Sequence, residues 1–191
     1  MPEVMTTTGE ITSSDRWEHF LIRWGYKRME HKVKPGIYSL GAPNPMSPVF
    51  VTANYKLSFD ALRSSIGAGD CYILVLNTFG INVWCAAGKG TFGTDELCLR
   101  IEVEELEKLV THRTVILPQL GASGVSAHEV KKRTGFTAEY GPVRASDIPE
   151  YMEAREASPS MRAVTFPLKD RAVLTPIEFS SAFWPMVALS L

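Results

Sequence analysis

The sequence predicts an α/β protein whose parallel β-sheet has helices on both faces. Three observations support this class: short apolar runs of strand length recur, segments of helix length separate them, and several of those segments begin with helix-capping residues. Strands that alternate with helices favour a parallel sheet, because parallel neighbours need a crossover connection. We therefore expect a Rossmann-like sheet with helices on both faces and a short cap helix that carries Cys85.

The length and composition fit one domain with a sizeable core. The chain has 191 residues, of which 45% are hydrophobic and 21% are charged, and its formal net charge is -1. A chain this close to neutral has no general attraction for a phosphate backbone, so we expect no nucleic-acid partner.

The cysteines exclude two kinds of site. Cys71, Cys85 and Cys98 are odd in number and form no C-x-x-C pair, so neither a disulfide framework nor a standard zinc or iron–sulfur site is predicted. The N-terminal residues lack the basic and then apolar pattern of a secretion signal, and no run reaches the 18 apolar residues of a membrane helix. Taken alone, the residues indicate a cytoplasmic chain.

Three segments are predicted along the chain. Residues 1–34 form an N-terminal helical extension, in which residues 16–34 mix aromatic and basic side chains and Pro35–Gly36 ends the helix. Residues 35–178 form the α/β domain. Residues 179–191 are largely apolar and have two interpretations: the start of a membrane segment, or a C-terminal helix that packs on the core.

The strands of the domain are predicted by short runs of β-branched and other apolar residues. Each run has the length of a buried strand and is followed by turn-forming residues. The predicted strands are residues 49–53, 72–77, 114–118, 136–140 and, last, 172–177.

The helices between the strands are predicted by capping residues and apolar stripes. A polar residue that can accept a backbone hydrogen bond precedes each stripe, and two segments have the spacing of a capping box. These signals are Ser58 before Phe59, Leu62 and Ile66; Thr94 with Asp95 and Glu96 before Leu99, Val103, Leu106 and Val110; the pair Ser126 and Glu129; and the pair Asp147 and Glu150.

The loops after the predicted strands are rich in Gly, Asn, Ser and Thr. They span residues 52–56, 77–94, 118–126 and 141–146. In open α/β sheets ligands bind outside the carboxyl ends of the strands, and these residue types allow close backbone approach and neutral hydrogen bonds. Any one such loop is explained by the needs of a turn. Four together predict a site for a large neutral or anionic ligand.

The longest of these loops contains glycine patterns that match no phosphate motif. A Walker phosphate loop needs glycine at Val83 and Ser or Thr at Gly90. Residues 88–93 read G-x-G-x-x-G, but they follow a Trp-Cys-Ala-Ala segment rather than a strand, so the dinucleotide fingerprint is not met either.

Cys85 has three open interpretations. Residues 82–89 predict a short helix with Asn82 as its cap, which places Cys85 in the first turn, where backbone dipoles favour a thiolate and hence a soft metal ligand. A buried inert cysteine is the second interpretation. The third is a nucleophile paired with His128.

Four stretches carry a resemblance to a known family. They are 82-NVWCAAGKGTFGT-94, 51-VTANYK-56, 117-LPQLGASGVSAHEVKKRTGF-136 and 140-YGPVRASDIP-149. With them the chain resembles, from about residue 17 to 179, the corrinoid-binding domain of the mercury-methylating corrinoid proteins of anaerobic bacteria and archaea. It is more distantly similar to the corrinoid domain in the large subunit of the corrinoid iron–sulfur protein.

The resemblance implies a corrinoid (cobalamin-type) cofactor, bound base-off, with the Cys85 thiolate as lower axial ligand to cobalt. Trp84 then either shields this thiolate from water or fills the core. The cofactor-binding residues implied are Asn54, Tyr55, Asn82, Val83, Trp84, Cys85, Ala86, Ala87, Gly88, Lys89, Gly90, Thr91, Phe92, Gly93, Thr94, Leu120, Gly121, Ala122, Ser123, Gly124, Val125, Gly141 and Pro142.

The implied activity is a methyltransferase reaction in which methyl-Co(III) corrinoid methylates Hg(II). The alternative is a corrinoid methyl carrier of one-carbon metabolism, similar to that of the acetyl-CoA pathway. The implied partners are a ferredoxin-like iron–sulfur protein as electron donor, a methyl-donor protein or methylated folate, and Hg(II) as substrate. The family's membrane-spanning part implies a position on the cytoplasmic face of the cell membrane, with residues 179–191 as its beginning.

Overall fold

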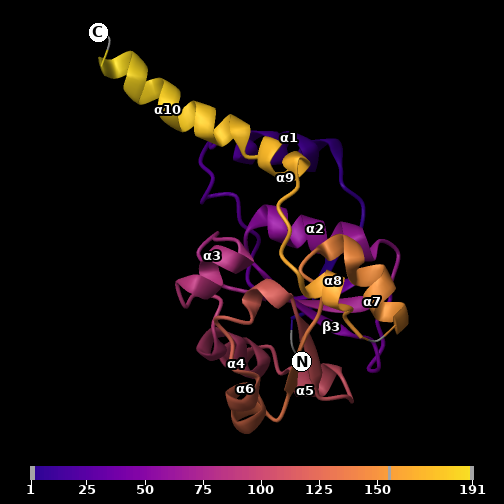
Figure 1. The fold of residues 1–191 in the computed structure, drawn as a ribbon. Coiled ribbons are helices and arrows are strands. Elements are labelled where there is room, and N and C mark those ends of the chain that lie inside the picture. The colour runs from indigo at the N-terminus through magenta and orange to yellow at the C-terminus, as the bar shows by residue number, and fades with distance from the viewer. Residues whose placement is uncertain (1–2, 155, 190–191) are drawn as a thin grey trace.

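The protein folds around one six-stranded sheet of mostly parallel strands (Figure 1). The structure is a computed structural model that describes residues 3–154 and 156–189. The strand order is β1-β2-β4-β3-β5-β6, in which β2 runs antiparallel to β4 and every other pair is parallel. The strands are β1 (Met5–Thr7), β2 (Gly36–Leu40), β3 (Val49–Ala53), β4 (Cys71–Leu76), β5 (Thr114–Leu117) and β6 (Thr137–Tyr140).

The topology confirms the predicted Rossmann-like class. Strands β4, β3, β5 and β6 lie in the order second, first, third, fourth along the chain, which is one of the two common doubly wound orders. The chain leaves β3 toward one side of the sheet to form β4 and then crosses to the other side to form β5. The topological switch point therefore lies between the carboxyl ends of β3 and β5.

Two apolar cores, one on each face of the sheet, explain the continuous apolar runs. Every residue of β3 and β4 is buried. Val49 and Val51 pack into one core, and Phe50 packs into the other. Strands covered on both faces lose the alternation of apolar and polar residues, so they read as uninterrupted apolar runs. This pattern made β3, β4 and β5 predictable.

Helices from different parts of the chain cover the two faces. The first core includes residues of α3, α4 and α6, and the second includes residues of α2, α7 and α8. The helices are α1 (Ser13–Arg23), α2 (Lys56–Ile66), α3 (Val83–Gly88), α4 (Thr94–Val103), α5 (Leu106–Leu109), α6 (Ala127–Thr134), α7 (Ile148–Ala154), α8 (Pro159–Arg162), α9 (Leu168–Ala172), α10 (Thr175–Leu189) and the 3-10 turns η1 (Gln119–Gly121) and η2 (Ala145–Asp147).

Two strands in the N-terminal part of the chain were not predicted. Strand β1 lies in the segment predicted to be helical, and β2 begins at Gly36, where only a helix end was predicted. Helix α1 ends at Arg23 instead of near residue 34, and Gly25 (φ +80°) and Lys27 (φ +44°) follow in the left-handed region. The backbone turns there because left-handed residues end an α-helix.

The predicted strand at residues 172–177 is wrong. Helix α9 ends at Ala172 and α10 begins at Thr175, so most of the run is helical. Its apolar residues resemble a strand, but Pro176 lies in the first turn of α10, where proline has no lost hydrogen bond. In the part of the chain that is described, no helix is both long and apolar enough to cross a membrane.

The helix signals were correct in part. Ser126 Oγ accepts a hydrogen bond from the backbone N–H of Glu129 (3.4 Å), as the capping spacing predicts. Ser58 is not a cap, because α2 already begins at Lys56, directly after the end of β3. Asp147 is not at a cap either, since it is the last residue of η2, which runs directly into α7.

The apolar stripe predicted after Thr94 has the wrong phase within α4, although its last two members, Leu106 and Val110, are buried. Leu99 and Val103 are exposed, whereas Leu97, Cys98 and Ile101 are buried in the sheet-facing side of α4. The stripe also crosses a helix break, because Glu105 (φ +47°) separates α4 from α5. A regular spacing of apolar residues was therefore read across two separate helices.

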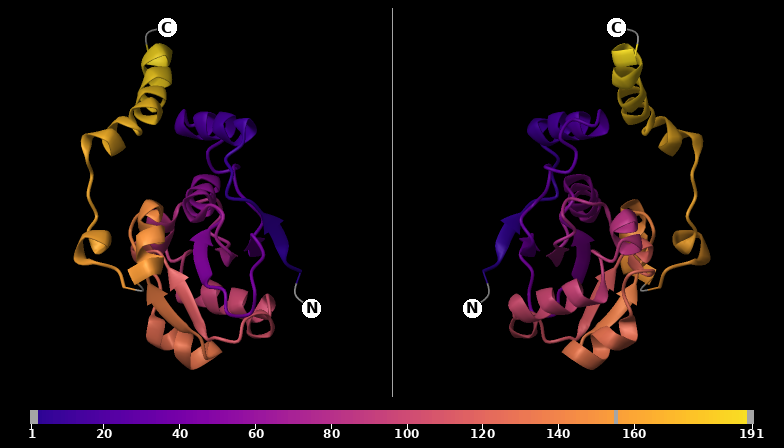
Figure 2. Two further views of the ribbon diagram at one scale, coloured as in Figure 1. Left: turned by 90° about the vertical axis from the view of Figure 1, so that its right-hand side faces the viewer. Right: turned by 90° about the vertical axis from the view of Figure 1, so that its left-hand side faces the viewer.

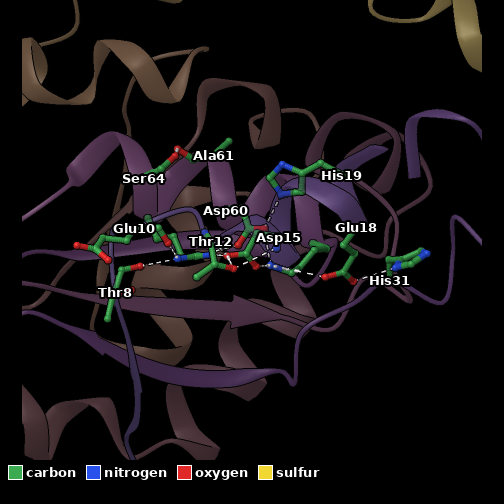
Figure 3. Close-up of polar contacts among 12 residues, drawn as sticks. Thr8, Glu10, Thr12, Asp15, Glu18, His19, His31, Asp60, Ala61 and Ser64 are labelled. Carbon is green, nitrogen blue, oxygen red and sulfur yellow. Dashed lines mark hydrogen bonds and ion pairs between the residues drawn. The ribbon is translucent and has the colours of Figure 1, made fainter. Parts of the chain in front are cut away.

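A cluster of charged side chains joins α1 to α2 (Figure 3). The Asp60 carboxylate is fully buried and accepts hydrogen bonds from Arg63 Nε (2.6 Å) and from Lys56 Nζ, and it contacts His19 Nε2 (2.7 Å). The same Lys56 and Arg63 reach Asp15 on α1 at 2.6 and 3.0 Å. We call Asp15, His19, Lys56, Asp60 and Arg63 the charged cluster.

The C-terminal part of the chain extends away from the sheet. Residues 163–167 are extended and connect α8 to α9, and α10 points away from the α/β body with α1 near its start (Figure 2). Ser180 Oγ donates a hydrogen bond to the backbone oxygen of Trp24 (3.1 Å). The start of α10 therefore rests on the end of α1. Of the predicted terminal segments, residues 1, 2, 190 and 191 lie outside the described residues.

Candidate functional site

A cavity of about 320 Å³ opens at the switch point between β3 and β5. Its floor includes Thr52 of β3 and Leu117 of β5, and one wall is formed by Pro142 and Val143 after β6. This is the edge at which ligands bind in doubly wound sheets. The predicted location of the site therefore coincides with a real cavity.

The lining of the cavity is apolar with few polar groups. Thr52, Ser58 and Asn82 bring polar side chains, and no charged side chain lines it among the described residues. Sites for flat organic ligands have this character, with a few hydrogen-bonding groups that set the orientation. The cavity suits an uncharged planar ring better than a phosphate.

Helix α2 forms a wall that the sequence analysis missed. Ser58, Ala61 and Leu62 face the cavity at the helical spacing of one face. Ser58 had been interpreted as a helix cap, so its side chain was not considered as part of the site. The small residues Ser58 and Ala61, directly after a predicted strand end, were the available signal.

Helix α3 confirms the predicted short cap helix. Asn82 is its N-cap, and Asn82 Oδ1 accepts a hydrogen bond from the backbone N–H of Cys85 (3.0 Å). Val83 and Ala86 are buried against the core, whereas Cys85 is exposed. The helix therefore turns its small apolar side inward and holds the thiol at the protein surface beside the cavity.

The position of α3 depends on close packing against the loop after β5. A Cβ added at Gly121 would lie 2.5 Å from Phe92 Cε1, and one added at Gly124 would lie 2.2 Å from the backbone oxygen of Phe92. The backbone N–H of Thr94 also donates to the oxygen of Gly124 (3.2 Å). These glycines allow two loops to meet, which explains their presence without a ligand.

Asn54 and Tyr55 have structural partners. Asn54 is 2% exposed, and its Oδ1 accepts hydrogen bonds from Thr78 N–H (3.1 Å), Thr78 Oγ1 (2.9 Å) and Gly80 N–H (3.0 Å). Tyr55 is 4% exposed, and its hydroxyl accepts a hydrogen bond from Arg28 Nε (3.2 Å). Asn54 thus ties the loop after β4 to the end of β3, and neither side chain lines the cavity.

The other residues implied by the resemblance fall into three groups. The first lines the cavity, the second is exposed on or after α3, and the third lies within the loop packing around them. The cavity-lining group is Asn82, Val83, Trp84, Leu120 and Pro142, and the exposed group is Cys85, Gly88, Lys89 and Gly90. The group within the loop packing is Ala86, Ala87, Thr91, Phe92, Gly93, Thr94, Gly121, Ala122, Gly124, Val125 and Gly141, and Ser123 is an exposed residue of the same loop.

The three cysteines have different environments. Cys71 and Cys98 are buried, and burial together with the charge of Asp70 raises the pKa of Cys71 to about 12. Cys85 is the exposed thiol, and no hydrogen bond joins it to His128 in the described part of the chain. The geometry thus gives no support to a cysteine–histidine pair.

Cys85 stands apart from other metal-binding side chains. Among the described residues, no group of three or more His, Cys, Asp or Glu side chains is placed to hold a metal ion. A metal at Cys85 would therefore take its remaining ligands from a cofactor, not from a cage of side chains.

Comparison with known proteins finds that the chain is similar to subunits of one enzyme system. Residues 26–152 match the family described as CO dehydrogenase/acetyl-CoA synthase delta subunit. The chain is 30% identical over 128 residues to the acetyl-CoA decarbonylase/synthase complex subunit gamma of Methanopyrus kandleri, a match covering 66% of this chain and 27% of the relative. The corresponding subunit of Archaeoglobus fulgidus is 31% identical over 124 residues, covering 64% and 26%.

The subunit from Methanocaldococcus jannaschii is similar to the same extent, with 29% identity over 127 residues, or 65% of this chain and 26% of the relative. The chain therefore spans about a quarter of the length of these curated relatives. The matched family region contains the cavity, α2 and α3.

Proposed function

We propose, from the premise that the chain belongs to the CO dehydrogenase/acetyl-CoA synthase delta subunit family, that this domain binds a corrinoid and carries a methyl group for one-carbon transfer. The relatives are named as subunits of acetyl-CoA decarbonylase/synthase complexes, so the methyl-carrier role accounts best for the family match. The observation that carries the proposal is the position of the exposed Cys85 helix beside an apolar cavity at the switch point.

The residues present fit a corrinoid. The cavity has room for a flat nucleotide base, and its uncharged lining suits an aromatic heterocycle. A Cβ added at Gly88 or Gly90 would meet no atom within 4 Å, so the surface after Cys85 is open to a much larger group. A corrin ring is too large for the cavity, and this open surface over α3 offers it a place.

A bound corrinoid supplies a cobalt centre that accepts and releases methyl groups, which no protein side chain does. The protein's part is to hold and orient it. In this proposal Cys85 holds the cobalt through its sulfur, Asn82 keeps the first turn of α3 in place through the 3.0 Å cap bond, and the cavity residues bind the base.

The first experiment is reconstitution of the purified chain with cobalamin, followed by visible absorption spectroscopy. We expect wild type to bind cobalamin in the base-off form and Cys85→Ala to bind it without the thiolate-dependent band. Cys71→Ala is the matched control, because Cys71 is 1% exposed and packs in the core on the face of the sheet opposite to α3. Absence of cofactor uptake by the wild type would refute the proposal.

Transfer of the methyl group to Hg(II) is the second candidate function. The exposed Cys85 on a capped helix favours it, because a thiolate at this position would donate electron density to a bound cobalt and would make a methyl group there a better carbanion donor to Hg(II). The partners proposed with it are a ferredoxin-like iron–sulfur protein and a methyl-donor protein or methylated folate.

A methyl-transfer assay separates the two candidates. Wild type loaded with methylcobalamin is mixed with Hg(II), and methylmercury is measured beside Cys85→Ala and the Cys71→Ala control. Mercury methylation predicts product from wild type and the control and at least a tenfold loss in Cys85→Ala. Cofactor binding without product in the wild type would leave the methyl carrier as the function.

We also propose that residues 179–191 attach the α/β domain, residues 35–178, to a membrane, with residues 1–34 as an N-terminal extension. The apolar composition of α10 supports this, with Phe179 and Phe183 stacked and exposed on its surface. Flotation with lipid vesicles tests it: the full chain should float with the vesicles, and a chain ending at residue 174 should not.

A further inference from the structure

An aromatic pair lies at the mouth of the cavity. Trp84 of α3 lines the cavity and is also 48% exposed, and Phe166 from the extended C-terminal segment is 45% exposed. Their ring centroids are 5.6 Å apart with an interplanar angle of 30°, which is a stacked arrangement. The pair joins two segments of the chain that are about 80 residues apart in sequence.

The segment that carries Phe166 is held at both ends. We call residues 163–167 the strap; they form neither helix nor strand between α8 and α9 (Figure 2). The Arg144 guanidinium donates to the backbone oxygen of Thr165 (3.1 Å), to Thr165 Oγ1 (3.2 Å) and to Asp170 Oδ2 (2.5 Å). At the other end, Val143 N–H donates to the oxygen of Met161 (2.8 Å).

The two anchors tie the strap to the cavity wall itself. Val143 lines the cavity and Arg144 follows it directly, so the strap begins beside one wall. Phe166 then reaches Trp84, which belongs to the α3 side of the same cavity. The strap therefore crosses from one side of the opening to the other.

We propose that Trp84 and Phe166 form an aromatic clasp over the cavity, and that this clasp retains the flat base of a nucleotide-bearing ligand and must open to admit it. The inference rests on the proposed corrinoid function. It adds Phe166, which lies outside the family match at residues 26–152, to the residues that contact the ligand. The ligand class is a planar heteroaromatic base, because the cavity is apolar and uncharged and an aromatic pair closes it.

The strength of the pair suits a clasp that opens. A half-exposed stacked pair favours contact by about threefold to tenfold in equilibrium constant, so the open state remains accessible. The contacts of Arg144 keep Phe166 close while the rings are apart. Removing the Phe166 ring should therefore speed both entry and release of the ligand, with a greater effect on release if the clasp contacts the bound base.

The test is stopped-flow absorbance of cobalamin binding and release by the full chain, comparing wild type with Phe166→Ala. We expect the release rate to rise about threefold to tenfold. Val164→Ala is the matched control: Val164 lies in the same strap, is 47% exposed and is not part of the ring pair. Phe166→Trp keeps an aromatic ring and should restore a rate close to wild type.

A second probe separates the base from the corrin ring. Cobinamide has the corrin ring without the nucleotide, so its release should be the same from wild type and Phe166→Ala. Equal cobalamin release from Phe166→Ala and wild type would overturn the clasp and leave the proposed function intact. Failure of the wild type to bind cobalamin would instead refute the proposed function, and the clasp with it.

Discussion

Helix α2 separates two regions of opposite chemistry. One of its faces carries Lys56, Asp60 and Arg63 into the charged cluster that holds α1, and another carries Ser58 and Ala61 to the apolar cavity. In the charged cluster strong polar groups are buried and paired. At the cavity the surface is apolar and open, and the nearby Cys85 thiol is exposed.

The difference shows which region is occupied by its own structural contacts and which region remains open. No buried side-chain nitrogen or oxygen among the described residues lacks a hydrogen-bond partner. A cluster whose polar atoms all have hydrogen-bond partners offers no free group to a ligand. An apolar cavity with a few polar groups still has surface that a ligand can contact. The charged cluster is therefore a structural contact between α1 and α2.

The largest expected effect comes from breaking the charged cluster. Arg63→Ala should lower the free energy of unfolding by about 3–5 kcal/mol, because it leaves the fully buried Asp60 carboxylate without its closest guanidinium partner. Urea unfolding followed by circular dichroism measures this. Lys34→Ala, which removes an exposed ion pair with Glu3, should leave the unfolding midpoint unchanged. Equal unfolding midpoints for wild type and Arg63→Ala would show that the charged cluster does not stabilise the fold.

Gly124→Ala should have the next largest effect, now on the cavity side. The new Cβ would lie 2.2 Å from the backbone oxygen of Phe92, so α3 or the loop after β5 must move, at a cost of about 1–3 kcal/mol in unfolding free energy. Leu99→Ala on α4 is the control, since Leu99 is exposed and does not line the cavity. We expect cobalamin binding to weaken in Gly124→Ala alone; equal loss in both variants would contradict this packing argument.

Acid should weaken the charged cluster before it affects the cavity. Burial raises the pKa of Asp60, but hydrogen bonds from Lys56, His19 and Arg63 outweigh burial and hold the pKa below its usual value. A lowered pKa stabilises the fold above the unfolded carboxyl pKa of about 4, and this contribution is lost as the pH falls through the folded value.

The Asp60→Asn variant tests this pH dependence. We expect its difference in unfolding free energy from the wild type to be smaller at pH 3 than at pH 7, because the contribution of the Asp60 charge begins to be lost below the unfolded carboxyl pKa of about 4. Urea unfolding at a series of pH values gives the result. A difference in unfolding free energy that is the same at pH 3 as at pH 7 would show that the Asp60 charge does not contribute to stability.

The smallest effect on stability is expected at Cys85, although its reactivity should be the greatest. One thiol should react rapidly with an aromatic disulfide reagent in the native protein, and Cys85→Ser should remove this phase while changing the unfolding free energy by less than about 0.5 kcal/mol. Cys71 and Cys98 are buried and should react only after unfolding. Two rapid thiols in the native state would contradict the assigned burial.

Local sequence was sufficient for the strands of the parallel sheet and for α3. The runs at 49–53 and 114–118 are mostly apolar because both faces of the sheet are covered, and such runs can be recognised without knowledge of their neighbours. Helix α3 was also predictable, because its N-cap Asn82 and its alanines all lie within the same short segment. The loops at the strand ends indicated the correct edge of the sheet.

Other features depended on contacts that span the chain. Strand β1 is three residues long and forms only by pairing with β2, and α2 begins at Lys56 although no side chain caps it. The resemblance implied that Asn54 contacts the cofactor, and in the structure its side chain accepts hydrogen bonds from the loop after β4. In each case a partner distant in sequence determined the role, and a single segment does not contain that partner.

The chain's residues alone thus indicated the fold class, the edge of the sheet at which the cavity lies, and the short helix that carries Cys85, because periodicity and capping act over a few residues. Long-range packing set the rest: the wall that α2 contributes, the pairing of the charged cluster, and the contact of Phe166 with Trp84. Burial and partner choice depend on how distant segments meet, and hydrophobic and electrostatic contacts between them exist only once the chain has folded.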